Sequence, residues 1–330
     1  GRVKSTSTDW QDEVFHSAWT NNLSASVSNS SEKGSFMLSG NYINQNGLMK
    51  ETFYRRYTAR LNSTYNISKV FSVGENLMIA QWNDRGYGTG DDRGIPYTAM
   101  RQHPAIPVTD SDGNWTNPMQ LSGSDIANPV HELYNGRDNT NESWRIFGNG
   151  YIDIKPIDGL TIKSNLGIEH TQYFNKTLGR RIQPSDMNSV SRAYGQGDTY
   201  TWTNTANYLK TFKGVHHFNA LVGSEFIKYR SEDLSGANRD YAFEDVDYMQ
   251  IGAGGGEQTV GGGKAEWALF SLFGKLDYNY ADRYLVSATL RRDQTSRLHK
   301  DNNSGVFPAF SGAWRVSEEK FFPQNKVVND

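Results

Sequence analysis

The pattern that decides the fold lies in residues 160–169, whose sequence is LTIKSNLGIE. Apolar and polar residues alternate there with a period of two, which predicts a β-strand with one apolar and one polar face. The apolar face would carry Leu160, Ile162, Leu166 and Ile168. The polar face would carry Thr161, Lys163, Asn165 and Glu169. A helix does not give this arrangement, because its faces repeat every 3.6 residues or so.

The same alternation recurs along almost the whole chain. It predicts eleven strands, at residues 21–30, 35–45, 52–67, 71–82, 143–155, 160–169, 199–211, 216–228, 265–280, 284–293 and 306–316. Helical periodicity is limited to residues 9–18, which is a short stretch. The sequence therefore predicts an all-β protein with antiparallel strands in up-and-down order.

Composition agrees with many strands and excludes several protein classes. The formal net charge is only −2, which argues against a nucleic-acid-binding protein with its basic excess. The chain has no cysteine, so disulfides, thiolate metal sites and a cysteine nucleophile are excluded. No apolar run approaches the roughly 18 residues of a transmembrane helix. A transmembrane β-strand, however, shows only alternation over about ten residues.

The predicted connections alternate between short and long. Short ones lie at residues 31–34, 68–70, 156–159, 212–215 and 281–283. Longer ones lie at residues 46–51, 83–142, 173–198, 229–264 and 295–305. Outer-membrane barrels have short periplasmic turns and long extracellular loops, whereas a soluble sandwich has no reason to sort its loops by length. The order of the connections therefore favours an antiparallel transmembrane β-barrel with long extracellular loops.

This interpretation assigns the two strand faces to two environments. The apolar face would contact lipid through Leu160, Ile162, Leu166, Ile168, Phe270, Leu272, Val286 and Leu290. The polar face would line the lumen through Lys163, Glu169, Lys275, Asp277 and Arg291. Aromatic residues beside the short turns, such as Tyr65 and Phe71, would form an interfacial girdle or pair across hairpins. Single-chain bacterial barrels have even strand numbers, so we expect about 10–12 strands of a larger barrel.

Motifs for catalysis or cofactors are weak. No HExxH, GxSxG or Walker-type motif occurs, and the glycine-rich residues 254–263 predict an outer loop. His216 and His217 could bind a metal, but an exposed pair at a turn is the better interpretation. Residues 110–114 are similar to a calcium loop but lack its glutamate at position twelve, so a hairpin turn is preferred. We expect no cofactor, no metal and no enzymatic activity.

The connection at residues 83–142 is the best candidate for solute binding. It carries Tyr87, Tyr97, Trp115 and Tyr134, together with charged residues such as Arg93. Flat aromatic faces beside planar polar groups suit sugar rings or peptides, and a loop of this length is usually functional. A folded cap that only packs on its neighbours is an equally good interpretation.

Four stretches of the sequence resemble the SusC/RagA type of TonB-linked outer-membrane proteins of Gram-negative bacteria. They are residues 8–15 (TDWQDEVF), LSGNY and QNG within residues 38–47, FGKLDY, DRYL and RRD within residues 273–293, and FPAFS and WRVSEE within residues 307–319. They occur in family order and span almost the whole chain. One departure is residues 294–298 (QTSRL), where the family often has Gly-Ser-Ser-Arg-Phe.

The resemblance implies a wide barrel of about 22 strands with a plug domain inside. It also implies a SusD-like lipoprotein as an extracellular lid, and import of oligosaccharides or peptides with energy passed through TonB. Residues 1–330 would then be part of the barrel domain, with the plug domain and the last strands outside this chain. The partners would be the lid, TonB, the solute and outer-membrane lipid, with no nucleic acid.

Two other functions remain open from the sequence alone. A secreted β-rich adhesin or carbohydrate-binding protein would pack its apolar faces against each other and would need no detergent. An outer-membrane hydrolase would need a convergent Ser/His/Asp group or a carboxylate pair, and the sequence offers no clear candidate for either.

Overall fold

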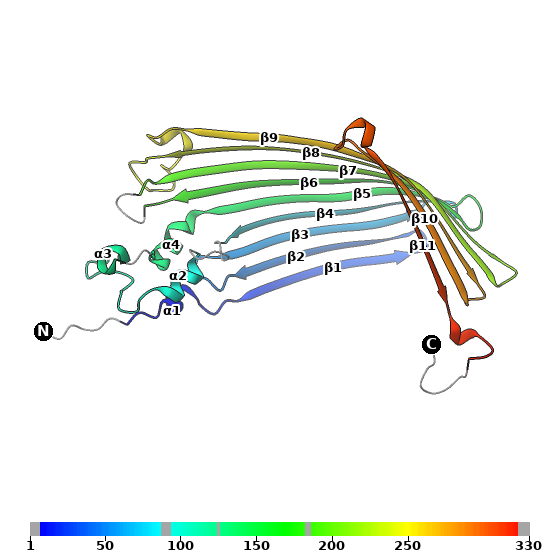
Figure 1. Ribbon diagram of the computed structural model, residues 1–330, viewed down its shortest axis with the longest axis horizontal. Helices are drawn as coiled ribbons and strands as arrows, with labels where there is room; N and C mark the ends of the chain where they lie inside the picture. Colours follow the sequence, from blue (N-terminus) through cyan, green and yellow to red (C-terminus); the bar gives the residue numbers. More distant parts are fainter. Residues whose placement is uncertain (1–6, 87–93, 124–125, 182–185, 323–330) are drawn as a thin grey trace.

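A computed structural model describes residues 7–86, 94–123, 126–181 and 186–322, and it contains one antiparallel sheet (Figure 1). Eleven strands follow each other in chain order, each paired with its sequence neighbours. They are β1 Thr20–Ser31, β2 Gly34–Asn46, β3 Phe53–Asn66, β4 Phe71–Arg85, β5 Thr140–Ile154, β6 Leu160–Gly179, β7 Ser189–Phe212, β8 His216–Arg239, β9 Thr259–Tyr280, β10 Tyr284–Thr295 and β11 Ser304–Trp314. The predicted up-and-down order of eleven strands is confirmed.

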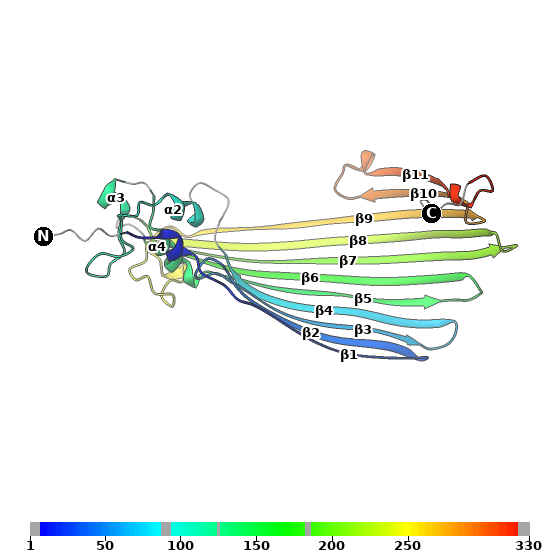
Figure 2. The ribbon, with the colours of Figure 1, turned by 90° about the horizontal axis from the view of Figure 1, so that it is seen from below.

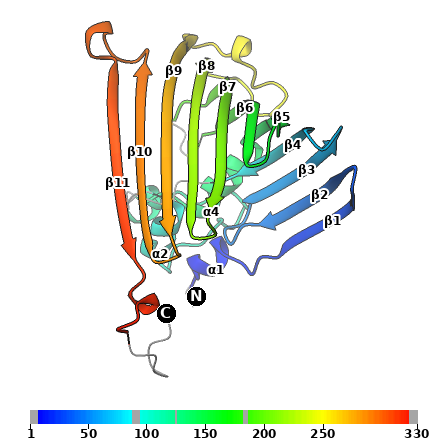
Figure 3. The same ribbon diagram turned by 90° about the vertical axis from the view of Figure 1, so that its right-hand side faces the viewer.

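The sheet is strongly curved and forms an open arc (Figures 2 and 3). Within the described ranges, β1 pairs only with β2 and β11 only with β10, so both edges of the arc lack a second neighbour. Lipid does not tolerate an unpaired strand edge, because no water is present to bond its N–H and C=O groups. The architecture is therefore that of a segment of a larger transmembrane barrel.

Four strands are longer than the sequence pattern indicates. The predicted loops 173–198 and 229–264 are mostly ladder, because β6, β7, β8 and β9 continue through them and leave only residues 180–188 and 240–258 as connections. In these extensions polar residues and glycines interrupt the apolar positions, so alternation of hydropathy is lost although the backbone ladder continues. The predicted boundaries were wrong for that reason.

The register gives the sheet one mainly apolar face and one mainly polar face, since paired residues point to the same side. We call the side with Leu166 the apolar face and the side with Asn165 the polar face. On the apolar face the row that contains Leu166 continues as Trp202, Phe226 and Phe270. The apolar residues on this face span nine residues of β6, from 160 to 168, and eleven residues of β9, from 270 to 280. A tilted strand needs about 9–11 residues to cross a bilayer, so the band has the height of a membrane.

Rings and charges mark the two borders of this apolar band. At the short turns, contacting rings on the apolar face run from Phe212 through Phe218 to Tyr278, with centroid distances of 5.7 and 4.6 Å. At the other border His170 lies 2.7 Å from Asp198, and Lys228 lies 2.7 Å from Glu266. Aromatic rings and charges at these heights are typical of the two membrane interfaces.

The polar face is the concave one. Side chains converge on the inside of a curved sheet and shield one another. Accordingly, Thr58, Ala80 and Ser271 on this face are at most 7% exposed although they lie in mid-strand. Aromatic rings cover its glycines, so that a Cβ at Gly74 would clash with the ring of Tyr151. Large residues on the apolar face, such as Leu166 at 52%, remain exposed on the convex side.

A small helical cap lies at the end with the long connections, inside the arc (Figure 3). It consists of α1 Trp10–Val14, α2 Ile95–Arg101, α3 Pro118–Ser122, α4 Pro129–Asn135 and the 3-10 turn η1 Gly136–Asp138. Its own core is formed by Trp10, Val14, Ile95, Ala99, Ile106 and Leu133. The helix expected at residues 9–18 ends at Val14, because Phe15 pairs as a β-bridge with Met49. In the described part of the chain, no helix has the length and apolar character needed to cross a membrane.

Asn128 holds the cap together. Its side chain is fully buried and accepts hydrogen bonds from the N–H groups of Val130 and His131 at the start of α4. Its amide group also donates to the carbonyl of Val108 at 2.9 Å. One side chain therefore caps a helix and fastens it to the preceding loop.

We predict that Asn128→Ala loosens the cap by about 2–4 kcal/mol, from the lost helix cap and the buried groups left unpaired. Limited proteolysis of the full-length protein should cut residues 86–139 much faster while the barrel stays intact. Asn117→Ala is the matched control, since Asn117 caps α3 in the same way at an exposed site. Equal cutting of both variants would contradict the role given to Asn128.

Candidate functional site

An aromatic cluster forms the centre of the cap. The ring of Trp115 stacks on His131 with 5.0 Å between centroids and an interplanar angle of 9°. The ring centroids of Tyr134 and Trp115 are 5.2 Å apart, and the guanidinium of Arg137 lies 3.6 Å from the centroid of the Tyr134 ring. The structure thus brings together Trp115 and Tyr134, two of the predicted solute contacts.

His131 and Arg137 were not among the solute-binding residues predicted from the sequence. The signal was present, because Asn128 followed by Pro129 is a helix start, and residues 131 and 134 then share one face of α4. Tyr97 lies in α2, where its ring contacts Arg101 at 5.1 Å. Tyr87 and Arg93, the other two candidates, lie outside the described residues.

The turn at residues 110–114 positions Trp115. The Asp110 carboxylate accepts hydrogen bonds from the N–H groups of Asp112 and Asn114, both at 2.9 Å, and these bonds lower the pKa of Asp110. Thr109 and Trp115 close the turn as a β-bridge, and Gly113 adopts a φ of 84°. The residues form the hairpin turn that the sequence favoured over a calcium loop.

Burial shifts the pKa values of two side chains in the cap towards their uncharged forms. His131 is 8% exposed, and its burial lowers its pKa, against the attraction of the Glu244 carboxylate. Burial also raises the pKa of the neighbouring Glu132 to about 7. Near neutral pH the cap therefore holds a neutral imidazole and a carboxyl group that is partly protonated.

Arg180 joins the cap to two strand connections. Its side chain is only 6% exposed, and it donates to the carbonyls of Asn135 at 2.7 Å and Glu244 at 3.1 Å, and to the carboxylate of Asp138. The Glu244 carboxylate in turn accepts from the N–H of Arg181. The cap, the β6–β7 connection and the β8–β9 connection are thus fixed as one unit.

A second apolar cluster supports this junction on the other side of the sheet edge. It comprises Leu178, Val190, Tyr241 and Met249. Asn188 binds the main chain of Tyr241 twice, by donating to its carbonyl at 2.9 Å and accepting from its N–H at 2.6 Å. The β8–β9 connection is therefore packed and hydrogen-bonded, which is unusual for a loop.

All five residues predicted to line the lumen lie on the concave polar face, where each is in an ion pair. Arg145 pairs with Glu169 at 2.7 Å, and Lys163 with Asp153 at 3.6 Å. Lys275 pairs with Asp277 at 3.0 Å. Arg291 pairs with Glu225 at 3.0 Å and with Asp293 at 2.7 Å.

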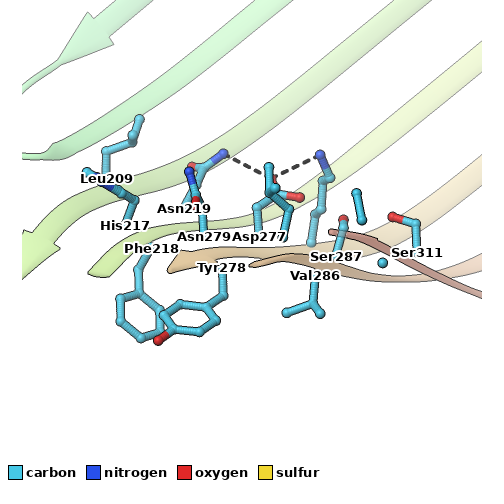
Figure 4. Close-up of a pocket in the computed structure, with 14 residues that line it drawn as sticks. Leu209, His217, Phe218, Asn219, Asp277, Tyr278, Asn279, Val286, Ser287 and Ser311 are labelled. Atoms are coloured by element: carbon cyan, nitrogen blue, oxygen red, sulfur yellow. Dashed lines mark hydrogen bonds and ion pairs between the residues drawn. The ribbon is translucent and has the colours of Figure 1, made fainter. Parts of the chain in front are cut away.

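A hollow of about 510 Å³ opens on the polar face near the short turns (Figure 4). Asn219, Asp277 and Ser287 project on one side of the sheet, and Phe218, Tyr278 and Val286 project on the other. Asn219 donates to the Asp277 carboxylate at 3.2 Å. The polar face therefore carries a hydrogen-bonded pair of polar side chains near the short turns as well.

All eight residues predicted to contact lipid lie on the convex apolar face, by the register. Contact with lipid itself stays a prediction. Among the described residues, no group of three or more His, Asp or Glu side chains is placed to hold a metal ion.

No family model matches the chain, but individual proteins are similar over almost its whole length. TonB-dependent receptor P3 of Formosa agariphila is 27% identical over 97% of this chain and 33% of its own length. TonB-dependent receptor SusC of Bacteroides thetaiotaomicron is 26% identical over 98% of this chain and 34% of its own. The chain thus spans about a third of the length of these curated relatives.

Solved structures give the same fold. The RagAB peptide importer in its "open-open" state superposes with a TM-score of 0.82, at 24% identity, over 97% of this chain and 36% of that chain. The outer-membrane transporter YddB of Escherichia coli superposes with a TM-score of 0.53 at 11% identity. These likenesses concern the fold alone, and the shared fold is that of an antiparallel outer-membrane β-barrel.

The class is therefore an outer-membrane β-barrel, and the chain is a segment of such a barrel located in the outer membrane of a Gram-negative bacterium. Its sequence is similar to TonB-dependent receptors, SusC among them, and its fold to that of RagAB, in agreement with the resemblance that the motifs in its sequence indicated.

We predict that the cap loses stability as the pH rises from about 4.5 to about 7, because Glu132 binds its proton more tightly in the folded cap than in the unfolded chain. Glu132→Gln should remove this part of the pH dependence. Proteolysis of residues 86–139 at pH 5 and pH 8 measures it. If wild type and variant are cut with the same pH profile, the burial of Glu132 has no energetic consequence.

Proposed function

We propose that this chain forms part of the barrel wall of an energised outer-membrane importer. The whole protein would take up oligosaccharides or peptides together with a SusD-like lipoprotein lid, and TonB would supply the energy. Residues 1–330 would belong to the barrel domain, and the plug domain and further strands would lie outside this chain. The observation that carries the proposal is the sorting of the sheet into a membrane-high apolar face and a polar concave face.

The two faces are proposed to meet lipid and the lumen. An apolar band nine to eleven residues high, bordered by rings and charges, fits the hydrocarbon layer. The ion-paired concave face fits a wet lumen, in which Lys163, Glu169, Lys275, Asp277 and Arg291 contact water or solute. A secreted adhesin would cover its apolar face, whereas Leu166 and Val286 are more than half exposed.

Solute capture is proposed at the aromatic cluster of the cap. Trp115 and Tyr134 offer ring faces, and Arg137 adds a planar donor group beside them. The cap lies at the mouth of the arc, where a solute would arrive from outside (Figure 3). Sugars and peptides both bind to such groups, so the choice between them needs a transport measurement.

The lid and TonB enter this proposal through the relatives. SusC is named a TonB-dependent receptor, and the RagAB structure is described as a peptide importer. Since the chain spans about a third of these proteins, the partners would bind surfaces that lie largely outside it.

We predict that Leu166→Arg costs about 2–4 kcal/mol of barrel stability, because the charge would lie near the middle of the apolar band. Asn165→Arg, one residue away on the concave face, should cost much less. Urea unfolding of the full-length protein in lipid vesicles measures both. Equal costs would count against the barrel and in favour of a soluble sheet.

We predict that Trp115→Ala and Tyr134→Ala each reduce solute uptake at low concentration about three- to tenfold, the effect of one lost stacking contact. Cells carrying the full-length protein and its lid would be supplied with fluorescent maltooligosaccharides or fluorescent tryptic peptides. Phe243→Ala is the control, since this exposed ring lies at the same end of the sheet, outside the cluster. Uptake of neither probe by the wild type would sink the proposed solute classes.

A further inference from the structure

We infer that the convex face over β1 to β5 binds a phosphate-bearing lipid of the outer leaflet, which in a Gram-negative outer membrane is lipopolysaccharide. One acyl chain would lie in a groove, and a phosphate would bind Arg55 and Arg85. The inference rests on the proposed lipid exposure of the apolar face. It does not depend on import or on the identity of the solute.

The groove is a hollow of about 560 Å³ on the apolar face. Its floor is one row of the register made of Ala25, Gly40 and Ala59. A Cβ at Gly40 would meet no atom within 4 Å, so the floor is open towards the membrane. Its rim is formed by larger side chains: Leu23, Tyr42, Tyr57, Ile79 and Trp144. Small residues beneath large ones leave this hollow on the convex side of the sheet.

The rows above and below the floor follow the depth profile of a bilayer leaflet. Towards the short turns the next row is Val27, Leu38, Leu61 and Leu77. Towards the long connections the next row contains Tyr42 and Tyr57, whose rings stack at 4.8 Å and 26°. Leucines lie at hydrocarbon depth, and tyrosines prefer the headgroup level. The groove therefore leads from hydrocarbon to headgroups.

Two arginines lie directly beyond the tyrosines on the same face. Arg55 precedes Tyr57 by two residues in β3, and Arg85 pairs with Phe53 in the row beyond Arg55. Their guanidinium groups lie 4.8 and 5.0 Å from the centroid of the Phe53 ring, which holds both cations beside one another. This is the height at which lipid phosphates are found, one step outside the aromatic row.

Both guanidinium groups keep donors for a ligand. Arg55 is exposed, and its Nε donates to Asn44 at 3.2 Å. Among the described residues, none of the ion pairs within 4.0 Å involves Arg55. Among the described residues, Arg85 has a single carboxylate contact, at 3.8 Å from Glu51. Planar guanidinium groups bind phosphate oxygens in pairs.

The charge around the arginines limits the site to β3 and β4. On β5 the row of Arg55 contains Glu142, which would repel a phosphate placed further along the sheet. A bound phosphate would thus lie over Phe53, with its acyl chain in the groove below. A soluble anion would use the arginines alone, and a second protein copy would use the groove alone. Their adjacency favours a lipid that uses both.

The test measures binding to the full-length protein in detergent, by native mass spectrometry, with deep-rough lipopolysaccharide as the probe. The same probe without its phosphates is the second ligand. Arg55→Ala should weaken binding of the intact probe about tenfold, the effect of one charge-assisted contact. Arg60→Ala is the matched control, because Arg60 lies on the same strand with its side chain on the concave face. It should leave binding unchanged.

Gly40→Leu tests the groove separately. The substitution has room on the convex side and fills the floor, so it should weaken lipopolysaccharide binding and leave competition by inorganic phosphate unaltered. The inference is overturned if Arg55→Ala and Arg60→Ala act alike, or if the dephosphorylated probe binds equally well. It is also overturned if inorganic phosphate displaces the probe at equal concentration, or if the groove carries a second copy of the protein. None of these outcomes bears on import, which the uptake measurement tests.

Discussion

The structure depends on one constraint, the match between a two-residue side-chain period and an unbroken hydrogen-bond register. Paired residues point the same way, so the face of every residue in the sheet follows from the face of Leu166. A slip of one residue in any strand would turn its whole apolar set towards the lumen. The ten strand pairs keep the register residue by residue, from Val27 opposite Leu38 to Ala288 opposite Phe310. The membrane-high band, the polar wall and the two borders all result from this match.

Beyond the band a different set of interactions holds the strands. A row on the apolar face runs His170, Asp198, Arg230 and Glu266, so that the Arg230 guanidinium has a carboxylate on each neighbouring strand. Hydrogen-bonded ladders and charged or polar pairs gain weight there, since these parts of β6 to β9 lie beyond the apolar band. The connections above them are then fixed by Arg180 and by Asn188. Order at the mouth therefore comes from buried polar contacts together with the two apolar clusters.

The sequence was sufficient for the strands in the band and for their faces, since apolar residues such as Leu166 and polar residues such as Lys163 fall on opposite sides of a two-residue period. It was insufficient above the band, where residues such as Gly195 and Gly197 carry no hydropathy signal although they lie in the ladder. It also could not bring Trp115 onto His131, because that contact depends on a turn and a helix that meet in space. The pair Arg55 and Arg85 was missed for a similar reason. The two are 30 positions apart and become neighbours only through the register.

In the proposed importer, the polar wall would act on the solute through its electrostatic field as well as through direct contacts. Arg145, Lys163, Lys275 and Arg291 are each matched by a carboxylate within 4.0 Å on the same face. Opposite charges this close cancel at the distance of a passing solute, especially in a salt solution that screens beyond about 8–10 Å. A wall of this kind presents hydrogen-bonding groups without a strong net potential, in contrast to a channel lined by one sign of charge. Of the solutes proposed above, uncharged sugars and zwitterionic peptides would suit such a wall, because they would gain its hydrogen bonds and meet no long-range attraction that would hold them in place.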